Sequence, residues 1–169
     1  MYYEQKGLTI APVFGKVIKE NLVLGIDAGI SFYNTNQNDA GIKQKQDSYT
    51  SGIFLRQYKS IGKGFYLFLQ SRLGYRFEKY DYTTAGLSTN NYKRHTIGLT
   101  ATPGISYAVG KRLHLETGLG NLFYLTYSHE NGIGYYSTAG KYKANTFNAG
   151  VDLNAFNTLY VGFRVFIGK

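Results

Sequence analysis

The chain has 169 residues, of which 43% are hydrophobic, and its formal net charge is +9 at neutral pH. No stretch approaches the ~18 consecutive apolar residues that a membrane-spanning helix needs, which excludes helical membrane proteins. The absence of cysteine excludes thiolate metal sites and cysteine nucleophiles. The length and the even composition predict a single domain over residues 1–169.

Alternation of apolar and polar residues predicts strands at about 6–17, 22–34, 48–59, 64–81, 93–109, 112–129 and 144–168. Tight turns are predicted at 19–21, 60–63 and 110–111, and long polar loops at 35–47, 82–92 and 130–143. Short turns alternating with long loops are typical of outer-membrane barrels. Because proline lacks the N–H that a strand ladder uses, we expect a β-bulge at Pro12 and at Pro103.

The strand at 22–34 shows most clearly how the two faces differ. Leu24 and Ile26 lie on one face, whereas Asp27 shares the other face with glycine and serine. Charges in mid-strand on the polar face predict a barrel with lipid outside and polar groups inside. The apolar row expected to face lipid comprises Leu22, Leu24, Ile26, Leu67, Leu69, Leu73, Leu113, Leu115, Leu119, Val161, Phe163 and Val165.

The predicted fold is all-β: an antiparallel up-and-down transmembrane β-barrel of about eight strands. Seven strands are visible if 144–168 is one strand, and eight if residues 154–158 make a turn; the unbroken alternation favours one strand. Bacterial barrels usually have an even number of strands. We therefore expect one more strand, and an export signal, before Met1.

Charged and polar side chains collect on the predicted inner face. We expect Arg56, Arg72 and Arg164 to pair with acidic side chains and to plug the lumen, because an interior of about eight strands is barely wide enough for its own side chains. A narrow or gated ion path is the alternative for the same residues. The predicted network comprises Asp27, Arg56, Gln70, Arg72, Arg76, Glu78, His114, Glu116, Asp152 and Arg164, with Asp27, Glu116 and Asp152 as the partners of the three arginines.

Several segments, in this order and spacing, resemble the small outer-membrane β-barrel domain proteins of Gram-negative bacteria, which are similar to OmpA-type barrels. They are 11–15 before 21–25, 54–58, 102–107 before 112–113, and 161–166. The resemblance implies the fold and a location in the cell outer membrane, but no reaction. The chain departs from the family by lacking its first strand and export signal, and by ending in Lys169 where an aromatic residue is usual.

No catalytic or metal-binding pattern stands out. Ser128 and His129 are adjacent in a strand, so they point to opposite faces and cannot act as nucleophile and base. His95, His114 and His129 share no ligand spacing. We therefore predict no enzyme activity, no metal and no cofactor. No glycine-rich phosphate loop or nucleic-acid motif accompanies the positive charge, which sets nucleic acid aside.

The predicted function is that of an integral outer-membrane barrel with a structural role, or with a recognition role through its exposed loops. Outer-membrane lipids, including lipopolysaccharide, are the expected partners of a monomer, and no small-molecule substrate is identifiable. The alternatives are a narrow porin-like channel, an enzyme acting on outer-leaflet lipid, and a soluble lipocalin-like barrel with Leu24, Leu69 and Phe163 inside. The basic residues expected near lipid phosphates are Lys43, Lys45, Lys79, Lys93, Arg94, Lys141 and Lys143. The aromatic residues expected in the outer girdle and loops are Phe32, Tyr33, Tyr80, Tyr82, Tyr92, Phe123, Tyr124, Tyr127, Tyr135 and Tyr136.

Overall fold

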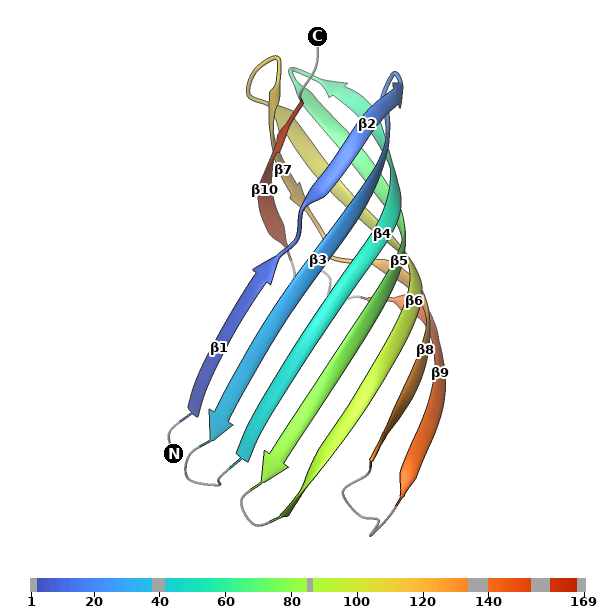
Figure 1. The fold of residues 1–169 in the computed structure, drawn as a ribbon. Helices are drawn as coiled ribbons and strands as arrows, with labels where there is room; N and C mark the ends of the chain where they lie inside the picture. Colours follow the sequence, from blue (N-terminus) through green and yellow to red (C-terminus); the bar gives the residue numbers. More distant parts are fainter. Residues whose placement is uncertain (1–2, 38–41, 85–86, 134–139, 153–158, 167–169) are drawn as a thin grey trace.

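A computed structural model describes residues 3–37, 42–84, 87–133, 140–152 and 159–166. In these ranges the chain forms one antiparallel β-sheet that curls into a half-barrel (Figure 1). Its strands are β1 (Tyr3–Ile10), β2 (Val13–Lys19), β3 (Leu22–Gln37), β4 (Ile42–Gly62), β5 (Phe65–Thr84), β6 (Leu87–Ala108), β7 (Leu113–Gly118), β8 (Phe123–Ile133), β9 (Lys141–Val151) and β10 (Tyr160–Val165). No helix in the described ranges is long and apolar enough to cross a bilayer.

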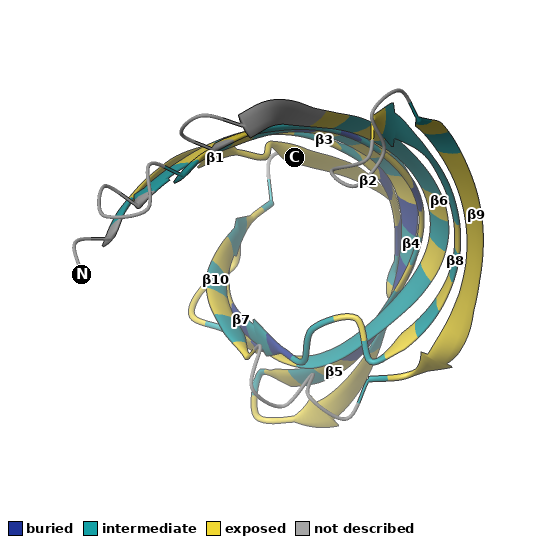
Figure 2. Ribbon diagram, turned by 90° about the horizontal axis from the view of Figure 1, so that it is seen from below, coloured by how far each residue is buried: buried dark blue, intermediate teal, exposed yellow. Residues whose placement is uncertain are grey.

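The ten strands occupy seven lines around the sheet. β1 and β2 both pair with β3 in one register, with Ile10 opposite Ile30 and Val13 opposite Asp27. At the other side, β7 and β8 both pair with β6, and β10 and β9 pair with β7 and β8 respectively. The all-β antiparallel architecture is thus confirmed. Within the described ranges no pairing joins β1 or β2 to β9 or β10, and the sheet is open along that side (Figure 2).

Much of what the sequence predicted as long loops is strand. β3 and β4 stay paired as far as Gln37 and Ile42, and β8 and β9 as far as Ile133 and Lys141. Opposite charges face each other across this extension, as Asp47 does Lys79. The loop prediction is wrong for these parts because both faces of the sheet are polar there, so apolar alternation no longer marks the strand. Residues 38–41, 85–86 and 134–139, including Tyr135 and Tyr136, lie outside the described ranges, as do 153–158 with the predicted alternative turn.

The tight turns lie at the opposite end of the sheet. Asn21 adopts φ 61° between β2 and β3, a left-handed conformation that asparagine tolerates better than most residues. Between β4 and β5, Gly62, Lys63 and Gly64 all have positive φ, at 93°, 52° and 81°. Glycine on both sides of Lys63 supplies the conformations that a side chain resists.

The two prolines differ in whether an irregularity accompanies them. Pro12 lies between β1 and β2, whose common register shows that no residue is inserted, so the bulge expected there is wrong. Pro103 stands opposite Leu69 in the unbroken pairing of β5 with β6. On its other side the register shifts by two residues between the pairs Ala101–Phe123 and Gly104–Gly118, and the Pro103 carbonyl accepts a hydrogen bond from the N–H of Leu119, at 3.1 Å. The irregularity expected at Pro103 therefore lies on the partner line, in the gap between β7 and β8.

The two faces of the sheet differ in polarity, with apolar side chains on the outside. Among the described residues, the buried hydrophobic side chains are Val23, Phe54 and Phe68. The buried polar ones are Ser48, Arg56, Glu78, Ser106 and Glu116. Soluble domains show the reverse preference, because charged groups are rarely buried there unless paired. The concave side of the sheet therefore holds the buried charged groups, and the buried positions lie mainly on the central strands (Figure 2).

Candidate functional site: the lumen

An apolar band with aromatic borders covers the convex face. At one border, ring contacts run from Phe32 to Tyr49 and from Tyr49 to Phe77, with centroids 6.3 and 6.2 Å apart. At the other border, Phe65 packs on Tyr107 at 4.6 Å. With a rise of ~3.4 Å per residue and a tilt of ~40°, β5 between these borders covers ~30 Å along the barrel axis. We call the two borders the mouth-side and the turn-side aromatic rows.

Most residues expected to face lipid are exposed on this band. Leu22 and Leu119 are half-buried; Leu119 falls in the gap between β7 and β8, where its N–H is bonded to Pro103. Exposure reaches 76% at Phe163 and 68% at Val161. The exposed members are Leu24, Ile26, Leu67, Leu69, Leu73, Leu113, Leu115, Val161, Phe163 and Val165.

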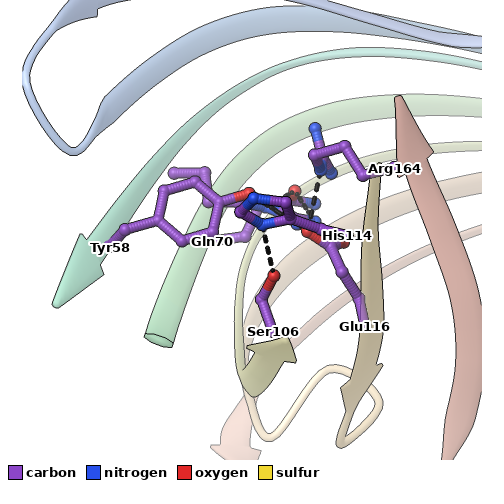
Figure 3. A network of polar contacts seen from close by, with 7 residues as sticks. Tyr58, Gln70, Ser106, His114, Glu116 and Arg164 are labelled. Carbon is purple, nitrogen blue, oxygen red and sulfur yellow. Dashed lines mark hydrogen bonds and ion pairs between the residues drawn. The ribbon is translucent and has the colours of Figure 1, made fainter. Parts of the chain in front are cut away.

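The lumen near the tight turns is filled by a cluster around one carboxylate, which we call the floor cluster (Figure 3). Glu116 on β7 accepts hydrogen bonds from Arg56 Nη1 at 2.6 Å, from Arg164 Nε at 2.9 Å and from the Tyr58 hydroxyl at 3.1 Å. Arg56 and Glu116 are only 4% and 5% exposed. A pair this deeply buried is costly to desolvate, so its geometry must use both carboxylate oxygens, as it does here.

The rest of the floor cluster completes the hydrogen bonding of Arg56. The side-chain oxygen of Gln70 accepts hydrogen bonds from Arg56 Nε at 2.9 Å and from Arg56 Nη2 at 2.7 Å. The guanidinium lies 4.3 Å from the ring centroid of Phe68. These contacts compensate the charge of Arg56, and a cavity of about 150 Å³ lies beside the cluster, against Tyr58 and His114.

His114 lies next to the floor cluster, on the side of the tight turns. Its Nδ1 lies 2.9 Å from Ser106 Oγ, and its ring contacts those of Tyr66 and Phe166 at 5.6 and 4.8 Å between centroids. Ser106 is fully buried. The structure thus brings together five of the predicted inward residues at one end: Arg56, Gln70, His114, Glu116 and Arg164.

A second ion pair lies further along the lumen. Arg72 Nε and Nη2 donate to the two carboxylate oxygens of Asp27, at 2.7 and 2.5 Å. Asp27 stands in register with Gly52 and Gly74 on the next two strands. A Cβ on Gly74 would overlap the Arg72 guanidinium, and one on Gly52 would come within 2.7 Å of it. A side chain at either position would displace the Arg72 guanidinium, which crosses both glycines to reach Asp27.

A cavity of about 570 Å³ lies beside this ion pair and is lined by Asp27, Arg72, Asp152, Arg76 and a set of threonines. The sequence predicted that Asp152 pairs with one of Arg56, Arg72 and Arg164; instead, Arg56 and Arg164 share Glu116, and Arg72 pairs with Asp27. Arg76, also predicted in the network, has no hydrogen bond or ion pair with any residue of the described ranges.

A third cluster lies beyond the mouth-side aromatic row. Glu130 accepts hydrogen bonds from Arg94 Nε at 2.7 Å and from the Tyr142 hydroxyl at 2.5 Å. Burial opposes ionisation of Glu130, but these two donors outweigh it and lower its pKa. Burial and the nearby Glu78 charge raise the pKa of Tyr80 to about 12. The buried Glu78 accepts from the Tyr80 hydroxyl at 3.1 Å.

The sequence prediction missed this mouth cluster because it began a loop at Glu130 and grouped Arg94, near the start of a predicted strand, with the basic residues near lipid phosphates. The rings of Tyr80 and Tyr92 stack at 4.3 Å on the same inner face, with the Arg94 guanidinium over both, so these tyrosines are not part of the outer girdle. The alternation of side chains could have predicted the position of Arg94. It lies two residues from Thr96, and residues two apart in a strand share a face, so Arg94 points inward with the other inward residues of β6.

Ser128 and His129 point to opposite faces. The Ser128 hydroxyl lies 2.9 Å from Thr96 Oγ1 in the lumen, and His129 Nδ1 lies 2.7 Å from Asn145 Oδ1 on the outside. In the described part of the chain, no three histidine or acidic side chains converge as metal ligands would.

Comparison with protein-family models, curated proteins and solved structures finds no match for this chain. The geometry of its two faces is therefore the basis for assigning a function.

Proposed function

We propose that this protein is an integral β-barrel of the Gram-negative outer membrane, with a lumen plugged by ion pairs and a structural or surface-recognition role. The observation that carries the proposal is the inverted polarity of the sheet: Leu73 and Phe163 are 49% and 76% exposed on the convex face, whereas Arg56 and Glu116 are buried inside. Transmembrane barrels have an apolar outer band ~25 Å tall with aromatic girdles. The band between the two aromatic rows is of that size.

Closure by one more antiparallel strand follows from the directions of the strands. With seven antiparallel lines, the first and the last run the same way. One strand running opposite to both would pair with each edge in antiparallel fashion and complete a barrel of about eight strands. A second copy placed edge to edge around the barrel axis would have to pair in parallel. In hydrocarbon, each unsatisfied backbone group costs several kcal/mol, so the edges need this strand.

The floor cluster favours a plugged lumen over the porin-like alternative. A conducting path would have to pass Glu116 and Arg56, which bind each other at 2.6 Å. Opening it would separate buried charges, at a cost of ~3–5 kcal/mol.

The proposed lipid partners include lipopolysaccharide. Lys93 stands next to Lys79 in the row just beyond the mouth-side aromatic row, and Lys143 lies in the same row on β9. Lysines at this level would meet the phosphates of the outer leaflet.

Site-directed fluorophores test the facing of the sheet, because the chain has no cysteine to remove. Leu73→Cys carries the label on the convex face, and Thr96→Cys, its matched control, carries it in the lumen. After refolding into phosphatidylcholine vesicles with brominated acyl chains, we expect strong quenching at position 73 and little at position 96. A monomeric protein in detergent-free buffer, or equal quenching at both positions, refutes the proposal.

A further inference from the structure

Arg76 differs from every other arginine that faces the lumen in the described ranges. Arg72 is bound by Asp27, Arg94 by Glu130, and Arg56 and Arg164 by Glu116. Arg76 has no such carboxylate. Arg76 is also exposed, so its guanidinium is open to a group that enters from outside the chain.

Two carboxylates on the same face of the sheet bind other side chains. Both oxygens of Asp27 bind Arg72. Glu78, on the same face of β5, accepts hydrogen bonds from Gln46 and Tyr80. Asp152 also lines the cavity. The N–H donors of Arg76 are therefore available to a ligand.

Hydroxyl groups flank the guanidinium on both neighbouring strands. Thr50 on β4 and Thr96 on β6 stand directly opposite Arg76, and the row continues to Ser128 on β8. Thr50 and Thr96 line the 570 Å³ cavity together with Arg76. Gly29, beside Thr50, leaves room for its hydroxyl, because a Cβ there would lie 2.7 Å from Thr50 Oγ1.

We propose that this cavity binds an oxyanion, a carboxylate or a phosphate group, on the Arg76 guanidinium with the threonine hydroxyls beside it. The planar fork of arginine matches either group with two parallel hydrogen bonds. The cavity lies in the size range of small-molecule sites. In the closed barrel proposed above, the floor cluster lies at the turn end, so the ligand enters from the mouth. The site goes beyond the proposed membrane role and depends only on the inward facing of Arg76.

Calorimetric titration of the detergent-refolded full chain tests the site, with inorganic phosphate in one arm and acetate in the other, at constant chloride. Saturable binding in either arm is expected, and the stronger arm identifies the group. Arg76→Gln should weaken it at least tenfold. Lys59→Gln is the matched control: it removes a positive charge from the adjacent strand β4, on the outer face opposite Leu67, and should bind as the wild type does.

Absence of saturable binding of both anions to the folded wild type overturns the site, and so does equal weakening by Lys59→Gln, which indicates non-specific attraction. If Arg76→Gln does not refold, Arg76→Lys replaces it: this variant keeps the charge without the fork and should bind several-fold more weakly, whereas unchanged affinity overturns the assignment. Membrane insertion is scored separately by the quenching experiment, so either proposal can fail alone.

Discussion

At the scale of single residues, the interior is organised by how each charge is compensated. Glu116 accepts hydrogen bonds from two guanidiniums and a phenol, and Asp27 accepts from one guanidinium with both oxygens. Glu130 accepts from one arginine and one tyrosine. Buried charges persist only with such complete pairing, and removal of one partner leaves the other uncompensated.

The first prediction concerns the floor cluster. Glu116→Gln should lower the free energy of unfolding by ~3–5 kcal/mol, because two guanidiniums lose their only carboxylate among the described residues. Urea unfolding in detergent measures it. Glu4→Gln, which removes an exposed pair with Lys6, is the control and should cost less than ~1 kcal/mol. Equal effects of the two substitutions would contradict a buried network.

The second prediction concerns the glycines beneath Arg72. Gly74→Ala should destabilise the fold by ~1–3 kcal/mol, because the new methyl group displaces the guanidinium from Asp27. Gly162→Ala, with nothing within 4 Å of its Cβ, should be almost neutral in the same unfolding assay. A neutral Gly74→Ala would show that Arg72 does not need its observed path.

The third prediction concerns pH. Because hydrogen bonds from Tyr142 and Arg94 lower the pKa of Glu130, its ionised form stabilises the folded state. This stabilisation is fully present above the unfolded pKa of about 4.5 and is lost as the pH falls through the lower folded pKa. In unfolding experiments from pH 6 to pH 3, Glu130→Gln should therefore differ most from the wild type at pH 6 and converge with it at low pH. A constant difference across this range would refute the coupling.

At the scale of strands, polarity changes along each line of the sheet. Between the aromatic rows, one face is apolar and the other polar; beyond the mouth-side row both are polar, and the strands continue. Cross-strand pairs such as Asp47 opposite Lys79, and side chains such as tyrosine and threonine that favour strands, accompany the extension. Sequence alternation therefore located the part between the two rows but ended each strand too early on the mouth side.

The fourth prediction places the lipid boundary on the strands. Leu73→Arg, in the middle of the band, should cost ~2–4 kcal/mol in vesicles, because a charge there meets hydrocarbon. Asn34→Arg, beyond the mouth-side row, should cost less than ~1 kcal/mol. Reversible unfolding from vesicles measures both. The membrane orientation would be wrong if the two variants were equally stable.

For the molecule as a whole, the open side of the sheet decides whether the lumen is enclosed. Seven antiparallel lines leave two edges that run in the same direction, and a lipid environment does not tolerate unpaired edges. In native outer membranes, where the barrel is complete, we expect the amides of β9 that do not bond to β8 to be as protected from hydrogen exchange as those that do. Exchange of every second β9 amide within minutes would contradict closure.

The amino-acid pattern alone predicts which side chains share a face, because successive side chains of a strand alternate whatever the strand pairs with. That sufficed to place Leu24 outside and Asp27 inside, and to predict that arginines and carboxylates meet in the lumen. The three-dimensional arrangement was needed to show that Glu116 binds both Arg56 and Arg164, and that Arg76 has no acidic partner in the described ranges. Partner choice depends on the register between strands and on the curl of the sheet, and these are set by contacts between residues distant in the sequence.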